Sequence, residues 1–172
     1  MKTYFAYLSG NFGRTHESII PLFLLLTLLM SSLRAEDEKF KVMTTFTVIA
    51  DIVKNVAGDA AQVESITKPD AEIHNYQATP GDLRRARDVD LIIYNGLNLE
   101  LWADKYFQNL NDVPSVIISH NIKPIGIRQG PYKGKPNPHA WMSPTNVLTY
   151  VDNVEVALAR YDSRNAGIYE LN

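Results

Sequence analysis

The chain has 172 residues, with 17 lysines and arginines against 19 aspartates and glutamates, and no cysteine. Its length supports one ordinary domain, and its composition, 45% hydrophobic and 21% charged, is typical of a globular protein. The balanced charge gives no sign of a polyanion-binding surface, so we expect no nucleic-acid partner. Without cysteine, thiolate metal sites, disulfides, cysteine nucleophiles and a lipid-modified N-terminal cysteine are excluded.

Residues 1–35 predict a secretory signal peptide. Residues 19–30 read IIPLFLLLTLLM, a run without charge that follows Lys2 and Arg14 and precedes a candidate cleavage site at Ala35. A positive region, a short apolar run and a small residue at the exit are the signature of such a leader. The alternatives are an uncleaved anchor or a buried core helix, but a membrane-spanning helix needs about 20 apolar residues. We expect cleavage, export to the periplasm and no membrane insertion of the mature chain.

Beyond residue 36, strand signals alternate with helix signals. Short β-rich or apolar runs predict four strands, at 39–44, 62–67, 90–94 and 115–118. Helical spacing and helix-start signals predict helices at 46–57, 80–89, 99–110 and from 144 to beyond 158. Thr79-Pro80-Gly81-Asp82 is a predicted helix start, and Gly58 is a predicted C-terminal cap. The stretch 123–138, rich in Pro, Gly and Lys, predicts a long loop or hairpin.

This alternation predicts an α/β fold, with a Rossmann-like parallel four-stranded sheet and helices on both faces. Ligands of such sheets bind beyond the carboxyl ends of the strands. The first predicted strand leads into Thr44-Thr45-Phe46-Thr47, which has no glycine, and the sequence contains neither GxGxxG nor a P-loop. Backbone amides need such glycines to approach phosphates, so we expect no nucleotide cofactor.

Two of the four histidines are candidate metal ligands. His74 lies in the connection after the second predicted strand, and His139 directly precedes the last helix. His16 belongs to the leader, and His120 follows a strand with no motif around it. Both candidates lie in connections, where this class of sheet places its ligands. On their own, two loop histidines far apart in the chain are weak evidence for a shared metal site, and surface or capping roles are favoured.

The segments around these histidines carry a family resemblance. They read IHNYQATPGDL at 73–83 and NPHAWMSP at 137–144, with KVMTTFTVIADIVKNVAGD at 41–59 and NGLNLELW at 95–102. In this order, the segments resemble the ABC-transporter substrate-binding proteins that are specific for metals. The resemblance extends over residues 39–172, and its two histidine motifs are the specific part.

The resemblance implies a two-lobed molecule, in which each lobe is Rossmann-like and one long helix joins them. The metal lies between the lobes, and His74 and His139 match the histidine pair of the first lobe. The second lobe adds a glutamate and an aspartate in manganese and iron relatives, or a further histidine in zinc relatives. We therefore assign residues 36–162 to an N-terminal metal-binding lobe, and 163–172 to the truncated start of the inter-lobe helix. A helix of about ten residues is too short to be stable alone, so we expect this end to be frayed.

The function implied is that of a periplasmic solute-binding component of an ABC importer for a divalent transition metal. It would act as a monomer with a membrane permease as its partner, and it would not be an enzyme. The interval between the two motifs contains His120 but no acidic cluster, which favours manganese or iron over zinc. Two alternatives stay open: a non-functional truncated fragment of such a protein, and a secreted metallohydrolase. Neither HExxH nor a Ser-His-Asp arrangement supports the hydrolase.

Three positions in the motifs carry further expectations. Asp70 stands where the family usually has glycine, which predicts strain if the turn requires a positive φ. Ala78 replaces a usual proline and is expected to change only the stiffness of the loop. Trp141 follows His139 by two positions; core packing is favoured over a role in shielding the metal.

Overall fold

The computed structural model describes residues 38–107, 110 and 112–172, so the predicted signal peptide lies outside the described residues. One parallel sheet has the strand order β2-β1-β3-β4. Its strands are β1 (Phe40–Thr44), β2 (Ala61–Ser65), β3 (Leu91–Tyr94) and β4 (Ser115–Ile117). The helices are α2 (Thr47–Ala57), α3 (Pro80–Arg87), α4 (Leu101–Phe107), α5 (Pro144–Tyr161) and α6 (Ala166–Tyr169), with 3-10 turns η1 (Ala140–Met142) and η2 (Ser163–Asn165). None of the helices in this described part is long and apolar enough to span a membrane.

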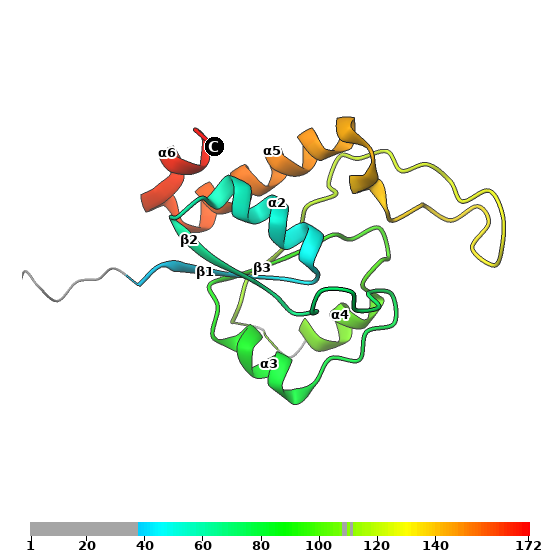
Figure 1. The fold of residues 1–172 in the computed structure, drawn as a ribbon, viewed down its shortest axis with the longest axis horizontal. Coiled ribbons are helices and arrows are strands. Elements are labelled where there is room, and N and C mark those ends of the chain that lie inside the picture. The colour runs from blue at the N-terminus through cyan, green and yellow to red at the C-terminus, as the bar shows by residue number, and fades with distance from the viewer. Residues whose placement is uncertain (1–37, 108–109, 111) are drawn as a thin grey trace, which may run out of the picture. The chain divides into compact units, whose positions relative to one another are not determined.

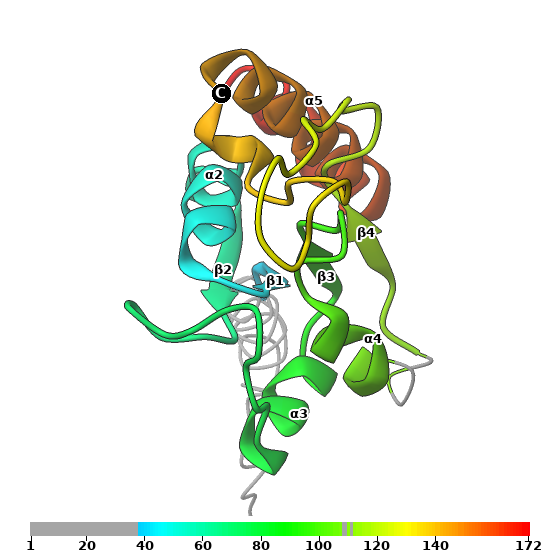
Figure 2. The same cartoon turned by 90° about the vertical axis from the view of Figure 1, so that its right-hand side faces the viewer.

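The predicted α/β fold is confirmed, with helices on both faces of the sheet (Figures 1 and 2). Helices α2, α5 and α6 cover one face, and α3 and α4 lie against the other. Neighbouring strand residues point to opposite faces, so Val42 and Ile93 join the core under α2 and α5, whereas Met43 and Ile92 join the core under α3 and α4. Burial on both faces explains why the strand residues LIIY read as a continuous apolar run.

Local signals set the start of α3 and the end of α2, as predicted, whereas α4 (Leu101–Phe107) is shorter than the predicted helix at 99–110. Thr79 caps α3: its hydroxyl accepts the Asp82 N–H at 3.2 Å, and the Asp82 carboxylate accepts the Thr79 N–H at 2.8 Å. Gly58 follows α2 with a φ of 54°, and its N–H donates to the Lys54 carbonyl. A positive φ is one that glycine adopts without strain, so the prediction that Gly58 ends this helix is confirmed.

The stretch 123–138 is a hairpin. Gly126 and Pro136 form an antiparallel bridge, and the Ile127 N–H donates to the Lys135 carbonyl at 2.9 Å. In Figure 1 this hairpin, drawn in yellow, runs out from the domain. Its backbone hydrogen bonds are internal, so it keeps a defined shape without packing into the core.

The C-terminal residues pack against the lobe, which differs from the predicted frayed end. Tyr169 is 1% exposed, and its hydroxyl donates to Asp162 Oδ2 at 2.6 Å. The Asn172 side-chain amide donates to the Val56 carbonyl at 3.0 Å, near the end of α2. The prediction of fraying considered helix length alone, whereas buried tertiary contacts stabilise this short segment. That residues 163–172 begin an inter-lobe helix stays a prediction.

Candidate metal centre

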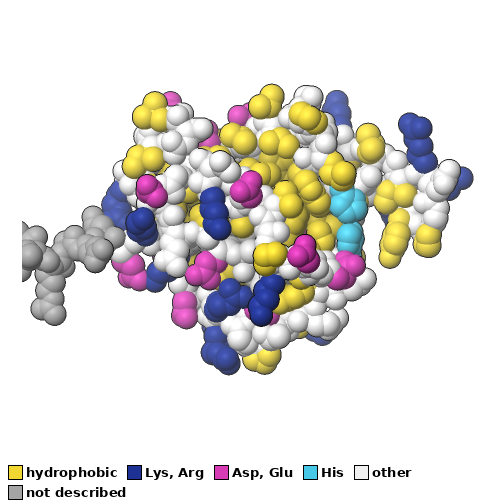
Figure 3. Space-filling view, in the orientation of Figure 1, with side chains coloured by type: hydrophobic (Ala, Val, Ile, Leu, Met, Phe, Trp, Pro, Cys, Tyr) yellow, Lys and Arg dark blue, Asp and Glu magenta, His cyan; other side chains and the backbone are white. Residues whose placement is uncertain are grey.

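The two predicted ligands meet beyond the carboxyl ends of the strands. The Nε2 atoms of His74 and His139 lie 3.1 Å apart, and their ring centroids are 5.2 Å apart at an interplanar angle of 63°. The two residues are 65 positions apart in the chain, and the parallel sheet brings their connections to one edge. Figure 3 shows histidine side chains at the surface there, bordered by hydrophobic side chains. His120 is exposed and is not part of this pair.

Each ring is held through its Nδ1 atom. His74 Nδ1 lies 2.8 Å from Glu72 Oε1, which also accepts the His74 backbone N–H at 2.7 Å. His139 Nδ1 lies 2.9 Å from Asn137 Oδ1, which accepts the His139 backbone N–H at 3.0 Å. Carboxylate and amide oxygens only accept, so these bonds assign the hydrogen of each neutral ring to Nδ1. Both Nε2 lone pairs are therefore free to face a common point, an arrangement that partners of metal-binding histidines commonly produce.

The separation of the two Nε2 atoms fits a shared ion. Two neutral rings with facing lone pairs at 3.1 Å repel each other, and a cation between them removes that repulsion. A tetrahedral ion bound at ~2.0–2.1 Å by both nitrogens would hold them about 3.3–3.4 Å apart, close to the observed distance. In the part of the chain that the structure describes, no group of three or more His, Asp or Glu side chains forms a metal site. The arrangement thus offers an ion two protein ligands.

The surroundings of His139 favour the ligating form of its ring. Burial lowers the pKa of His139, and the neighbouring His74 lowers it further. Hydrogen bonds from the His74 backbone N–H, and then from the His74 ring, lower the pKa of the exposed Glu72 carboxyl. Glu72 therefore stays ionised as an acceptor, while His139 loses its proton more easily. Neutral imidazole is the form that binds a metal.

A buried carboxylate near this edge was not predicted from the sequence. Glu100 is 4% exposed and accepts the Thr45 hydroxyl at 2.7 Å. It also accepts the backbone N–H groups of Asn95 at 2.8 Å and Gly96 at 3.0 Å. Burial raises the pKa of Glu100, although each of these hydrogen bonds lowers it. The segment NGLNLELW contains all but one of these residues, but nothing in its spacing shows that the glutamate folds back onto the preceding amides.

The His74 loop is anchored by aromatic side chains from α4. Trp102 Nε1 donates to the Ile73 carbonyl at 2.8 Å, and the Tyr106 hydroxyl donates to the Ala78 carbonyl at 2.8 Å. These bonds hold the loop on either side of His74, although the loop itself contains no helix or strand. The sequence motif contains the loop residues but does not indicate which side chains hold them.

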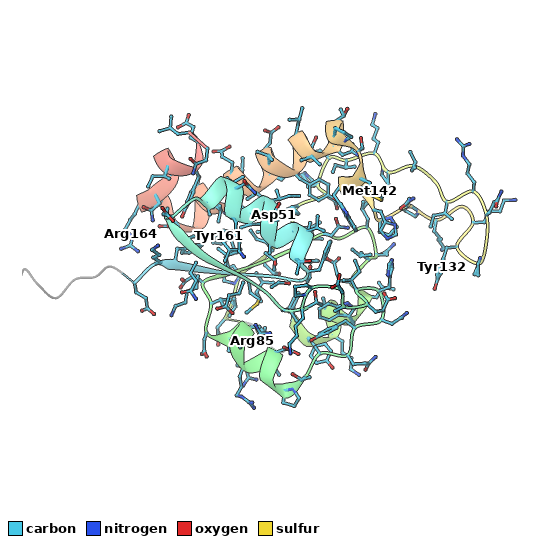
Figure 4. The ribbon with its side chains drawn as sticks, viewed as in Figure 1. Asp51, Arg85, Tyr132, Met142, Tyr161 and Arg164 are labelled. Carbon is cyan, nitrogen blue, oxygen red and sulfur yellow. The ribbon has the colours of Figure 1, made fainter. Side chains whose placement is uncertain are left out.

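The expectations for Asp70 and Trp141 are confirmed. Asp70 adopts a φ of 62°, the left-handed conformation that glycine tolerates without strain. Trp141 packs against the core, with its ring centroid 5.0 Å from that of Phe46. The centroid of the same ring lies 5.2 Å from that of the His139 ring, so Trp141 also borders this candidate ligand. Met142 lies beside it in η1, 76% exposed, and Figure 4 shows this residue near the base of the hairpin that carries Tyr132.

A parallel α/β sheet with paired histidines at its carboxyl edge is typical of one lobe of a metal-binding solute-binding protein. The chain belongs to such a family: residues 42–172 match the family model described as zinc-uptake complex component A, periplasmic (ZnuA). The predicted resemblance to metal-specific ABC-transporter substrate-binding proteins is thereby confirmed.

Individual relatives agree with this assignment. The chain is 55% identical to the iron-binding protein YfeA of Yersinia pestis, over 78% of this chain and 43% of that protein. It is 34% identical to the manganese ABC transporter substrate-binding lipoprotein PsaA of Streptococcus pneumoniae, over 83% of this chain and 48% of that protein. The Mn-bound periplasmic metal-binding protein of candidatus Liberibacter asiaticus aligns with a TM-score of 0.71 at 39% identity, covering 77% of this chain and 50% of that one. The chain spans about half the length of these relatives.

Proposed function

We propose that this chain is the N-terminal lobe of the periplasmic solute-binding component of an ABC importer for a divalent transition metal, with His74 and His139 as ligands. The observation that carries the proposal is the 3.1 Å separation of the two Nε2 atoms, with each Nδ1 held by an acceptor. The relatives are named for iron and for manganese, and a more distant structure is that of a Zn(II)-bound ZnuA-like domain. These names support a transition metal as cargo, and we keep manganese or iron as the favoured choice over zinc.

The relatives also support the transport setting. They are named as metal-binding or substrate-binding proteins, which agrees with a chain that binds cargo and catalyses no reaction. We propose a membrane permease as the partner of a monomeric binding protein. The proposed organisation is a signal peptide at 1–35, the metal-binding lobe at 36–162 and the start of the inter-lobe helix at 163–172.

Export gives a direct test of that organisation. If residues 1–35 are a signal peptide, the chain recovered from the periplasm begins near Glu36. N-terminal sequencing of periplasmic material checks this. Recovery of a chain with intact Met1 from the cytosol would contradict it.

The proposed ligand pair predicts weak metal binding and a particular order of affinities among the metals. Two imidazoles leave the remaining coordination positions to water, so affinity is expected to be low. By the usual affinity order, these two nitrogens bind copper or zinc more tightly than manganese, because they include no hard carboxylate ligand. Affinity should fall in acid, since protons compete for the imidazole nitrogens, and the lowered pKa of His139 extends the binding-competent form of this ring to more acidic pH.

Calorimetric titration with zinc tests the site. We expect His74→Ala and His139→Ala each to abolish most of the binding seen with residues 36–172. His120→Ala is the matched control, because His120 is an exposed histidine outside the pair, and this variant should keep the parent's affinity. Equal binding by the parent and both ligand variants would show that the ion, if bound, lies elsewhere.

A further inference from the structure

Two asparagines from outside the loop hold the peptide groups on either side of His139. Asn95, which follows β3, donates from Nδ2 to the Pro138 carbonyl at 3.1 Å. Asn146, in the first turn of α5, donates from Nδ2 to the Ala140 carbonyl at 3.0 Å. The backbone around His139 is thus tied to the sheet on one side and to a helix on the other.

Asn95 is itself held in place. Its side chain is fully buried, and its Oδ1 accepts the Tyr150 hydroxyl from α5. Its backbone N–H donates to the buried Glu100 carboxylate. The next residue, Gly96, has a φ of 83°, and a Cβ there would lie 2.5 Å from Ile117 Cγ2. The turn after Asn95 therefore packs closely against the Ile117 side chain, and hydrogen bonds hold both polar atoms of the Asn95 amide.

Such anchoring matters for a site to which the described residues contribute two ligands. The Nε2 atom of His139 must stay about 3 Å from that of His74 to share an ion, and a shift of about 1 Å would loosen the site. If a loop becomes ordered only when the ion binds, the affinity for the ion is lower, because part of the binding free energy offsets the entropy lost in ordering the loop. Groups that orient metal-binding histidines typically change affinity by about 10–100-fold when they are removed.

We propose that Asn95 and Asn146 are positioning residues for metal binding: by holding the Pro138 and Ala140 carbonyls, they keep the His139 ring facing His74. Neither side chain touches the ion. The inference rests on the proposed metal site and assigns the sequence segment NGLNLELW a role at that site.

Zinc titration of three variants gives the first test. We expect Asn95→Ala and Asn146→Ala to weaken binding by about ten-fold, the lower end of the range for groups that orient ligands. Asn146 is half-buried at the start of α5, so its variant keeps the test decisive if Asn95→Ala fails to fold. Asn153→Ala is the matched control, because Asn153 donates to the Ile118 and His120 carbonyls and so anchors a different loop to the same helix. The zinc affinity of Asn153→Ala should stay within about two-fold of the parent's, since this variant removes hydrogen bonds of similar strength that do not hold the peptide groups around His139.

The metal-free protein gives the second test. Long-range ¹H–¹⁵N spectra of the imidazoles should show one ring state for His139 in the parent, and altered or broadened His139 signals in Asn95→Ala and Asn146→Ala. The His74 signals and the Asn153→Ala spectrum should match the parent's. Failure of the parent to bind zinc would refute the proposed function, and the ring signals would still decide the positioning role. The inference would be overturned if Asn95→Ala and Asn146→Ala both kept the zinc affinity and the His139 signals of the parent. It would also be overturned if Asn153→Ala lost as much zinc affinity as they do.

Discussion

Asp82 connects the His74 loop to α3 through one carboxylate. Its Oδ2 accepts the Thr79 N–H and hydroxyl, both at 2.8 Å, and the Tyr76 hydroxyl at 3.1 Å. Its Oδ1 accepts Arg85 Nη2 at 2.8 Å, and the side chain is only 11% exposed. Burial raises the pKa of Asp82, but the hydrogen bonds from Thr79, Arg85 and Tyr76 outweigh it and lower the pKa from 3.8 to about 2.

This pKa predicts how much Asp82 contributes to stability and at which pH. Because the pKa is lower in the folded chain than in the unfolded one, the contribution is present above about pH 4 and lost as the pH falls towards about 2. At 1.36 kcal/mol for each pKa unit, the ionised carboxylate contributes about 2 kcal/mol to the free energy of unfolding at neutral pH. We expect Asp82→Asn to lose about this amount at pH 7 and nearly nothing near pH 2.

Urea unfolding followed by circular dichroism at pH 7, 4 and 2.5 measures this difference. Asp51→Asn is the matched control, since Asp51 is an exposed aspartate on α2 (Figure 4), and it should change the free energy of unfolding by less than about 0.5 kcal/mol. The reasoning is refuted if Asp82→Asn is as stable as the parent at pH 7. It is also refuted if the loss of stability has the same size at pH 2.5 as at pH 7.

Two further predictions concern backbone strain and the C-terminal segment. Asp70→Gly should raise the free energy of unfolding by about 0.5 kcal/mol and leave zinc affinity unchanged, because glycine adopts the φ of 62° without strain; a less stable variant in thermal unfolding would contradict this. Tyr169→Ala should lower the free energy of unfolding by about 3 kcal/mol and speed amide exchange over residues 163–172, because the ring is 1% exposed. Tyr169→Phe, the matched control, should lose only about 1 kcal/mol with the Asp162 hydrogen bond; equal stability of Tyr169→Ala and the parent would show that the segment does not depend on this packing.

The sequence by itself determined the order of the elements of this lobe and some of their ends. The apolar run of β3, the capping residues Thr79 and Asp82 and the C-terminal Gly58 act on neighbours within a few positions, so their effects can be read without knowing the fold. Strand and helix alternation then predicted the parallel sheet. It also placed His74 and His139 in connections where such sheets bind ligands.

Tertiary structure alone decided how those connections meet. The 3.1 Å approach of His74 to His139 depends on strand order and on two loops that are remote in sequence. The bond from Asn95 to the Pro138 carbonyl spans 43 positions, and burial of Tyr169 depends on contacts with α2 and α5. Periodicity and capping describe interactions between near neighbours, whereas these contacts depend on which distant surfaces pack together. For the same reason, the resemblance in sequence could pair the two histidines, while only the packed lobe shows what holds His139 in place.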